Sequence, residues 1–240
     1  MTVAIIQARM SSSRLPGKVM KPLLGQPMIG RQIERLQRAR RLSRIIVATS
    51  TDPLDDLLAD YVRTLGVGLY RGDLDDVLGR FMGALNSAGR PDTFLRLTAD
   101  CPLADPDVVD QCIAHHLAGG YDYTHNSPGW TFPKGLDVEV CQITALEAAF
   151  NTAHDPYERE HVTPYIYRHP EQFRIGEVRR DPPLRWRWTV DVPADFAFVT
   201  AVYEGLYPQK PDFRLDDISA WQVKHPDLAL PHDPDAPAPR

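Results

Sequence analysis

The feature that most constrains the fold of this 240-residue chain is a regular alternation of strand-like and helix-like segments over its first half. Four segments rich in apolar and β-branched residues predict buried strands; they span residues 3–8, 44–50, 67–72 and 93–99. Four segments that repeat apolar residues at helical spacing predict helices; they span residues 27–42, 53–66, 73–85 and 105–120. This order predicts an α/β fold with a mostly parallel sheet and helices on both faces.

The second half of the chain contains the same two kinds of segment in a looser order. Strand-like segments span residues 121–126, 136–143, 173–178 and 185–192. Helix-like segments span residues 143–150, 157–169, 193–207 and 215–225. We find no internal repeat and no convincing linker, so we expect one domain over residues 1–225. The Pro- and Asp-rich residues 226–240 are expected to form a frayed tail.

Charge, hydropathy and cysteine usage exclude several classes of protein. The net charge of −5 is unlike that of a general nucleic-acid binder, which is more often basic. No run of about 18 apolar residues predicts a membrane span, and the start "MTVAIIQARM" lacks the pattern of a signal peptide. Cys101, Cys112 and Cys141 are odd in number and widely spaced, which favours a reducing compartment over a disulfide or zinc framework. We therefore expect a cytoplasmic protein with neither nucleic acid nor membrane as a partner.

A polar loop directly follows the first expected strand. The stretch "IIQARMSSSRLPGK" combines three serines with the cations Arg9, Arg14 and Lys18. It lacks the three glycines of a dinucleotide-binding fingerprint. It also fails as a P-loop, because Ser12 stands where the first glycine belongs and Val19 where the magnesium-binding hydroxyl belongs.

Side chains must then do much of what backbone amides do in those known phosphate loops. Arg9 and Arg14 can each fork onto phosphate oxygens, and Lys18 can supply a movable point charge. The Pro16–Gly17 pair predicts a turn that aims Lys18 back over the loop. The residues alone leave a solvated loop with ordinary salt bridges as an equal alternative.

Two carboxylates stand at the ends of expected strands. Asp100 follows residues 93–99, and Asp191 follows the run "RWRWTV" just before Pro193. Magnesium prefers hard oxygen ligands, and one or two carboxylates suffice when phosphates and water complete its shell. Taken singly, Asp100 could be a turn residue and Asp191 a helix cap. The pair at one edge of a sheet predicts a metal site.

Charged residues in the second half form a second candidate site. Asp137 and Glu139 share one face of an expected strand, and Lys134 precedes them. In "RWRW" the arginines Arg185 and Arg187 alternate with two tryptophans that we expect in the core. These acids could hydrogen-bond sugar hydroxyls and Arg187 could grip an acidic group, or all of them could face water.

The motif "ARMSSSRLPGK" closely resembles the N-terminal signature of the cytidylyltransferases that activate acidic sugars. These include the synthetases of CMP-linked 3-deoxy-manno-octulosonate and of CMP-linked nonulosonates. A branch named for spore-coat polysaccharide biosynthesis is most similar, through "LTADCP", "GLDVEV", "EHVTPYIY" and "TVDVPADF". The resemblance runs from about residue 3 to about residue 221. It implies a three-layer, Rossmann-like nucleotidyltransferase fold of the glycosyltransferase-A type, with the nucleotide over the N-terminal half and the acceptor over the C-terminal half.

The resemblance also implies residue roles. Holding CTP falls to Ala8, Arg9, Ser13, Arg14, Lys18, Arg80 and Thr98. Ala8 would act through backbone carbonyls near it, and Thr98 would contact the base. Catalysis falls to Arg9, Lys18, Asp100 and Asp191, of which Asp100 and Asp191 would bind Mg²⁺. The acceptor falls to Lys134, Asp137, Glu139 and Arg187. In "TVDVPADF", Val192 departs from the polar residue common in the family.

The function expected from these residues is magnesium-dependent transfer of a cytidylyl group from CTP to an acidic sugar or related small acid, with release of pyrophosphate. A surface-polysaccharide pathway and a homodimer are implied by the resemblance. Two alternatives stay open: a glycosyltransferase that consumes a nucleotide-sugar, and a nucleotide-binding protein without turnover. The single aspartate of "ADCP" argues against the first, since such enzymes usually carry Asp-x-Asp there. A metal-binding or general-base role for His161, which lies among acids, also stays open.

Overall fold

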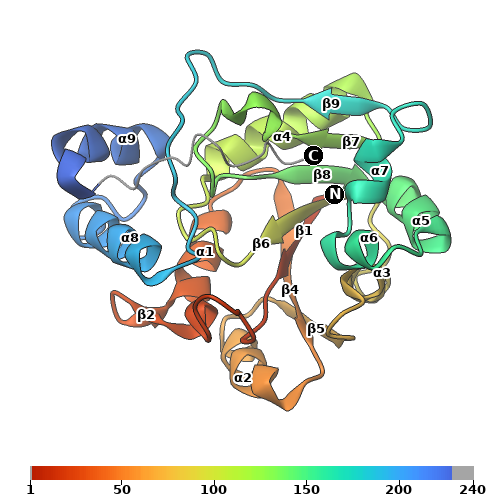
Figure 1. The fold of residues 1–240 in the computed structure, drawn as a ribbon, viewed down its shortest axis with the longest axis horizontal. Helices are drawn as coiled ribbons and strands as arrows, with labels where there is room; N and C mark the ends of the chain where they lie inside the picture. Colours follow the sequence, from red (N-terminus) through yellow and green to blue (C-terminus); the bar gives the residue numbers. More distant parts are fainter. Residues whose placement is uncertain (1, 229–240) are drawn as a thin grey trace.

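The computed structural model describes residues 2–228 and has a twisted seven-stranded sheet at its centre (Figure 1). The strand order is β5-β4-β1-β6-β8-β7-β9. The strands are β1 (Thr2–Gln7), β4 (Leu42–Ser50), β5 (Gly68–Gly72), β6 (Thr93–Thr98), β7 (Tyr123–His125), β8 (Glu139–Gln142) and β9 (Ile175–Glu177). Only β8 runs antiparallel to its neighbours within this described sheet. A small hairpin pairs β2 (Pro22–Leu23) with β3 (Gln26–Pro27).

Helices cover both faces of the sheet, as the alternation predicted. One face carries α1 (Met28–Leu36), α2 (Asp56–Thr64), α4 (Pro106–Gly119), α8 (Pro193–Leu206) and α9 (Leu215–Lys224). The other carries α3 (Val77–Ser87), α5 (Ile143–Thr152), α6 (Pro156–His161) and α7 (Pro164–Arg168). Strand β1 shows why both faces need cover. Ala4 and Ile6 pack into the hydrophobic cluster on the face that carries α1, whereas Val3 and Ile5 pack into the cluster on the face that carries α3. The α/β fold class with a mostly parallel sheet is confirmed.

The carboxyl ends of the central strands meet at one edge. Gln7 at the end of β1 is in register with Thr98 of β6 on one side and with Ala48 of β4 on the other. The loops that follow these strands therefore leave the sheet side by side, which is where open α/β sheets bind ligands. Both the Ser- and Arg-rich loop and Asp100 start from this edge.

Two expected elements of the second half are wrong in detail. Residues 185–192 form an extended segment without a regular strand, because its pairing is limited to a bridge between Lys134 and Arg187. Of its tryptophans, Trp188 is buried and Trp186 only partly so. The expected helix over 157–169 is broken into α6 and α7 at Val162, whose φ is 73°.

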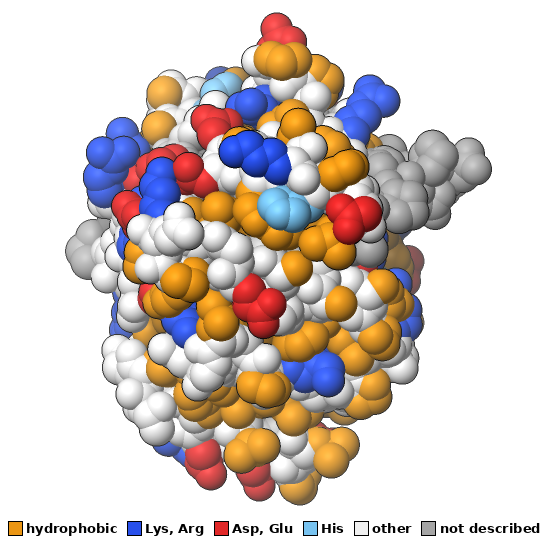
Figure 2. Space-filling model, turned by 90° about the vertical axis from the view of Figure 1, so that its left-hand side faces the viewer, with side chains coloured by type: hydrophobic (Ala, Val, Ile, Leu, Met, Phe, Trp, Pro, Cys, Tyr) orange, Lys and Arg blue, Asp and Glu red, His pale blue; other side chains and the backbone are white. Residues whose placement is uncertain are grey.

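The remaining surface gives few clues on its own. Over the face that carries α8 and α9, hydrophobic side chains recur between charged ones (Figure 2). None of the helices within residues 2–228 is both long and apolar enough to span a bilayer. Most of the expected tail, residues 229–240, lies outside the described residues; residues 226–228 form a short 3-10 helix.

Candidate functional site

The loop after β1 is shaped by two contacts. The amide of Met10 donates to Asp55 Oδ1 at 2.7 Å, and the amide of Gly17 donates to the Met10 carbonyl at 2.9 Å. Gly17 has a φ of 69°, a conformation that glycine adopts without strain. The resulting turn brings Lys18 back toward the sheet edge, as the Pro16–Gly17 pair predicted. Asp55 was not singled out from the sequence.

Asp55 is buried and anchors the loop to the neighbouring strand. Its Oδ2 accepts from the hydroxyls of Thr49 (2.9 Å) and Ser50 (2.5 Å) at the end of β4. Burial alone would raise the pKa of Asp55, but these hydrogen bonds outweigh it and hold the pKa below its usual range. The carboxylate therefore stays charged and keeps the loop in place.

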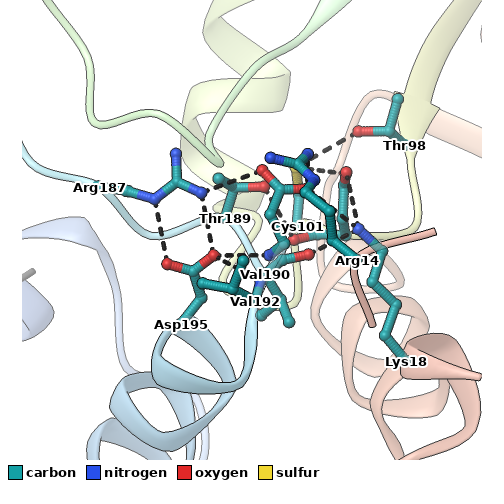
Figure 3. A network of polar contacts seen from close by, with 11 residues as sticks. Arg14, Lys18, Thr98, Cys101, Arg187, Thr189, Val190, Val192 and Asp195 are labelled. Carbon is teal, nitrogen blue, oxygen red and sulfur yellow. Dashed lines mark hydrogen bonds and ion pairs between the residues drawn. The ribbon is translucent and has the colours of Figure 1, made fainter. Parts of the chain in front are cut away.

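Lys18 contacts both of the aspartates that were predicted to share a metal, and Figure 3 shows it in a polar network with Arg14, Arg187 and Asp195. Its Nζ donates to the Val190 carbonyl at 2.7 Å, to Asp191 Oδ1 at 3.2 Å and to Asp100 Oδ2 at 3.4 Å. The carboxylates come from the end of β6 and from the segment before α8, which are far apart in sequence. Both converge on one cation, as residues of a single site would.

Arg187 and Asp195 hold Asp191 in place. Arg187 Nη2 donates to Asp191 Oδ2 at 3.0 Å and to Asp195 Oδ2 at 2.9 Å. Asp195 also accepts from the amides of Asp191 (2.7 Å) and Val192 (3.0 Å). Asp195, and not Asp191, therefore caps α8, so the helix-cap alternative for Asp191 falls. An acid in the first turn of an expected helix was the sequence signal for Asp195.

The pKa of Asp191 follows from these partners. Burial would raise it, but the charges of Lys18 and Arg14 outweigh burial and hold the pKa below its usual range. Arg187 is held in turn: its bonds to Asp195 raise the pKa of the guanidinium. Arg187 lines neither of the two cavities described below, so its position does not support the predicted acceptor contact.

A cavity of about 320 Å³ opens over the loop and the ends of β1 and β6. All seven residues predicted to hold the nucleotide line it: Ala8, Arg9, Ser13, Arg14, Lys18, Arg80 and Thr98. The side chain of Arg14 is 62% exposed and pairs with Asp191 at 2.9 Å. Arg9 is 41% exposed and lies 3.7 Å from Glu160. Both arginines are thus exposed enough to exchange these partners for phosphate.

Arg80 and Thr98 form the inner wall. Arg80 is buried, and its Nη1 donates to the Asp73 carbonyl at 2.7 Å. Burial lowers the pKa of Arg80, with the Asp55 charge opposing that shift. Thr98 lies with its hydroxyl 3.5 Å from Cys101 Sγ and belongs to this cavity and to the next one.

A cavity of about 560 Å³ adjoins the first and shares Asp100 and Asp191 with it. Lys134, Asp137 and Glu139, three of the predicted acceptor residues, line it. Asp137 lies in the loop before β8, exposed to the cavity, and accepts from the Gly135 amide at 2.8 Å. Burial within the cleft, together with the nearby charge of Asp100, raises the pKa of Asp137.

His161 lies where these cavities meet. It ends α6, lines both cavities, and its ring centroid is 4.2 Å from that of Tyr157. Burial lowers its pKa, which favours the neutral imidazole. Within residues 2–228 no group of three or more His, Cys, Asp or Glu side chains is arranged to hold a metal, so the metal-binding reading of His161 gains no support.

The residues present nevertheless fit Mg²⁺. Asp100 and Asp191 each turn one carboxylate oxygen to the point where Lys18 Nζ lies. A magnesium ion held by a nucleotide needs only one or two protein carboxylates, since phosphate oxygens and water supply the rest. The donor set is hard oxygen on both sides, as that ion requires.

Comparisons with known proteins agree with this geometry. The family model described as "Cytidylyltransferase" matches residues 3–203. The chain is 31% identical to the spore coat polysaccharide biosynthesis protein SpsF of Bacillus subtilis, over 96% of this chain and 98% of that protein. It is 34% identical to the 3-deoxy-manno-octulosonate cytidylyltransferase of Geobacter sulfurreducens, over 46% of this chain and 43% of that one.

Solved structures show the same fold. A cytidylyltransferase of Leptospira borgpetersenii superposes with a TM-score of 0.89 at 29% identity, covering 95% of both chains. CMP:2-keto-3-deoxy-manno-octonic acid synthetase, solved with CTP, superposes with a TM-score of 0.62 at 19% identity, covering 85% of this chain and 98% of that one. The chain therefore belongs to the cytidylyltransferase family, which includes the enzymes that activate acidic sugars, and is a nucleotidyltransferase.

Proposed function

We propose that this nucleotidyltransferase uses CTP and Mg²⁺ to activate an acidic sugar or related small acid, releasing pyrophosphate. The observation that carries the proposal is the convergence of Asp100 and Asp191 on Lys18 at the boundary between two cavities. A nucleotide bound over the loop would present its α-phosphorus at that boundary. An acceptor in the adjoining cavity would reach it from the other side.

The protein's part in such a reaction is to position reactants and neutralise charge. The acceptor oxygen would form a bond to the α-phosphorus as the bond to pyrophosphate breaks, and the proton of the acceptor hydroxyl would pass to water. Arg9, Arg14 and Lys18 would contact the negative triphosphate. Lys18 would exchange a carboxylate partner for phosphate when the nucleotide enters.

Asp100 and Asp191 would hold the magnesium ion. When bound, Mg²⁺ supplies positive charge that offsets the charge of the leaving pyrophosphate. Arg187 and Asp195 keep Asp191 oriented toward that position through the contacts described above. Within this proposal the chain supplies the ligands, and the nucleotide completes the metal site.

The acidic acceptor is supported by the cavity and by the relatives. Lys134 and Arg96 line the acceptor cavity, which Arg14 also borders, so the cavity carries positive charge that suits a carboxylate. The names of the Bacillus and Geobacter relatives concern polysaccharide biosynthesis and an acidic sugar. We extend both to this chain, as a role in surface polysaccharide biosynthesis in the cytoplasm, and we also propose a homodimer. The glycosyltransferase and non-catalytic alternatives gain no support from these relatives.

The test is pyrophosphate release with each of CTP, UTP, ATP and GTP against a panel of acidic sugars. We expect turnover with CTP that stops when EDTA removes magnesium. Equal or better turnover with UTP or a purine nucleotide would contradict the use of CTP while leaving the phosphate loop and metal site standing. Size-exclusion chromatography with light scattering tests the dimer.

A further inference from the structure

The boundary between the cavity over the loop and the acceptor cavity is lined by side chains that belong to both. They are Arg14, Thr98, Asp100, His161 and Asp191. The attack on the α-phosphorus proposed above takes place at this boundary, where the attacking hydroxyl must lose its proton. The two aspartates are the proposed magnesium ligands, Arg14 is a permanent cation, and the Thr98 hydroxyl is far too weak a base. Of this set, His161 is the side chain whose ordinary pKa lies near neutrality.

Both ring nitrogens of His161 are available to a ligand. Within residues 2–228 neither has a hydrogen-bond partner, and neither is enclosed by protein atoms. The buried His116 differs, because its two nitrogens contact Thr124 and Gln142, as expected of a histidine that serves packing. The His161 ring is held by Tyr157 instead, at 4.2 Å between the ring centroids. Whichever nitrogen carries the lone pair can therefore accept a proton from the cavities.

An unusual turn of the backbone fixes the position of His161. The Thr163 amide donates to the His161 carbonyl at 2.9 Å, and Val162 between them has a φ of 73° and a ψ of −54°. These values define the rare, strained form of the γ-turn, which is especially unfavourable for a β-branched residue. The Val162 side chain is fully buried, and the Thr163 hydroxyl donates to Glu139 at 3.0 Å, so both neighbours hold the turn. Strain of this kind persists only where the surroundings enforce it, and it is concentrated at functional sites.

The charges around the ring suit a group that takes up a proton and releases it. Burial lowers the pKa of His161, Glu160 and Glu139 oppose that shift, and Arg96 and Arg168 add to it. The ring is therefore neutral before the reaction, and the two carboxylates stabilise it once it is protonated. The loop, the strand ends and α3 place further charges along the same space, from Arg9, Arg14, Arg80, Asp100 and Asp191.

We propose that His161 is the general base of the transfer and takes the proton of the acceptor hydroxyl that attacks the nucleotide. This inference rests on the proposed function. As the O–H bond breaks, its electron pair forms the bond from the acceptor oxygen to the α-phosphorus. The P–O bond to pyrophosphate breaks, and its electron pair leaves with pyrophosphate. The proton passes to a ring nitrogen of His161 and from there to water, which restores the neutral ring.

His161→Gln and His161→Ala test this role, and His154→Gln, at an exposed histidine before α6, is the matched control. Single-turnover release of pyrophosphate from CTP, with the most active acidic sugar of the panel, separates chemistry from product release. In both His161 variants the rate should fall about 10²- to 10⁴-fold, the usual contribution of a general base. Their Kd for CTP should be unchanged, which also shows that they are folded. His154→Gln should keep the rate of the parent.

Two further measurements are specific to a proton acceptor. The rate of the parent should fall as the pH drops through the pKa of His161, because a protonated ring cannot accept a second proton. Both His161 variants should lack this dependence. Added imidazole should restore part of the rate of His161→Ala, in proportion to the unprotonated fraction of the imidazole, and should leave the parent unchanged. A side chain that only shaped the cavity would give neither result.

Three results overturn the inference: a parent-like rate in His161→Gln, a loss confined to CTP binding, or a reduced rate that keeps the pH dependence of the parent and does not respond to imidazole. If the parent releases pyrophosphate only from another nucleotide, the use of CTP in the proposed function is wrong. The same variants are then compared with that nucleotide, and the same results decide the role of His161. Release from none of the four nucleotides contradicts both proposals.

Discussion

Two clusters of charged side chains flank the acceptor cavity, and they are built differently. The loop cluster joins Lys18 and Arg14 to Asp100 and Asp191, with distances of 2.9–3.4 Å. The strand cluster consists of Arg96, Glu139, Tyr123 and Thr163, with distances of 2.5–3.0 Å. Loops and strand ends supply the first cluster, whereas β6, β7 and β8 supply most of the second.

The difference is between exchangeable and fixed partners. In the loop cluster Lys18 and Asp191 are 11% and 10% exposed, but Arg14 is 62% and Asp100 28% exposed, so water, phosphate or a metal can reach the cluster through Arg14 and Asp100. In the strand cluster Arg96 and Glu139 are 13% and 17% exposed, and Glu139 has three donors. Removing one member of a buried pair leaves an uncompensated charge, which is strongly unfavourable. We infer that the loop cluster binds the nucleotide and the metal, and that the strand cluster fixes the position of side chains beside the acceptor cavity.

The largest expected effect is a loss of activity when the loop cluster is disrupted. Asp100→Asn and Asp191→Asn keep the shape of the side chain but remove the charge that would hold Mg²⁺. Loss of several kcal/mol of metal-dependent stabilisation corresponds to about 10²- to 10⁴-fold in kcat. Asp60→Asn, at an exposed carboxylate on α2, is the control.

The double variant Asp100→Asn/Asp191→Asn should be little worse than either single one, because either loss already dismantles the site. Calorimetric titration of Mg²⁺ into the CTP complex gives an independent readout. If Asp191→Asn binds the ion and turns over like the parent, Asp191 is structural.

The next largest effect is expected when the strand cluster is disrupted, and it should be a loss of stability. Glu139→Gln leaves the buried Arg96 without its counter-charge, so the free energy of unfolding should fall by about 3–5 kcal/mol. The control is Glu147→Gln, whose partner Arg90 is 58% exposed; there the loss should be at most about 1 kcal/mol. Urea unfolding measures both. Equal losses would remove the distinction between the two clusters.

Lys18→Met separates nucleotide from metal in the loop cluster. CTP binding should weaken by about 10- to 100-fold, because one charge-assisted contact is lost. Mg²⁺ binding to the CTP-free protein should strengthen, because no ammonium then competes for Asp100 and Asp191. Lys21→Met, on the neighbouring cation that lies over the Phe196 ring, is the control for a lost lysine. Titration calorimetry with CTP alone and with Mg²⁺ alone distinguishes the two effects.

A smaller effect concerns pH. The pKa of Glu139 in the folded protein lies below its usual value of 4.5. Its contribution to stability is therefore complete above pH about 4.5 and is lost as pH falls through the folded pKa. The difference in unfolding free energy between the parent and Glu139→Gln should shrink as pH is lowered from 6 to about 3. A difference that stays constant would mean that charge is not what Glu139 contributes.

The smallest effect is expected at Thr98. Its hydroxyl can accept from the amine of cytosine, but it can also turn and donate to the carbonyl of uracil. Thr98→Val should lower the preference for CTP over UTP by about 1 kcal/mol or less, the net value of one neutral hydrogen bond. The ratio of kcat/KM for the two nucleotides measures it. A loss of most selectivity would make Thr98, and not backbone carbonyls near Ala8, the main determinant.

The sequence by itself determined the sheet, its two covered faces and the edge that carries the site. Strand and helix periods are local, so they show in a window of residues. Because parallel strands end at one edge of a sheet, the sequence alone assigns Arg14, Lys18 and Asp100 to the same edge. The nucleotide cavity contains all seven residues named for it from the sequence.

Tertiary structure alone decided which charges pair. Arg96 bonds Glu139 across 43 positions and Lys18 bonds Asp191 across 173, and no local period encodes either contact. Arg187 looked available for an acceptor, but packing of α8 brings Asp195 against it. The run "RWRW" looked like a strand, but a strand needs a continuous partner, and within residues 2–228 this run forms an isolated bridge to Lys134. Side-chain alternation is a property of one segment, whereas pairing depends on where a second segment packs.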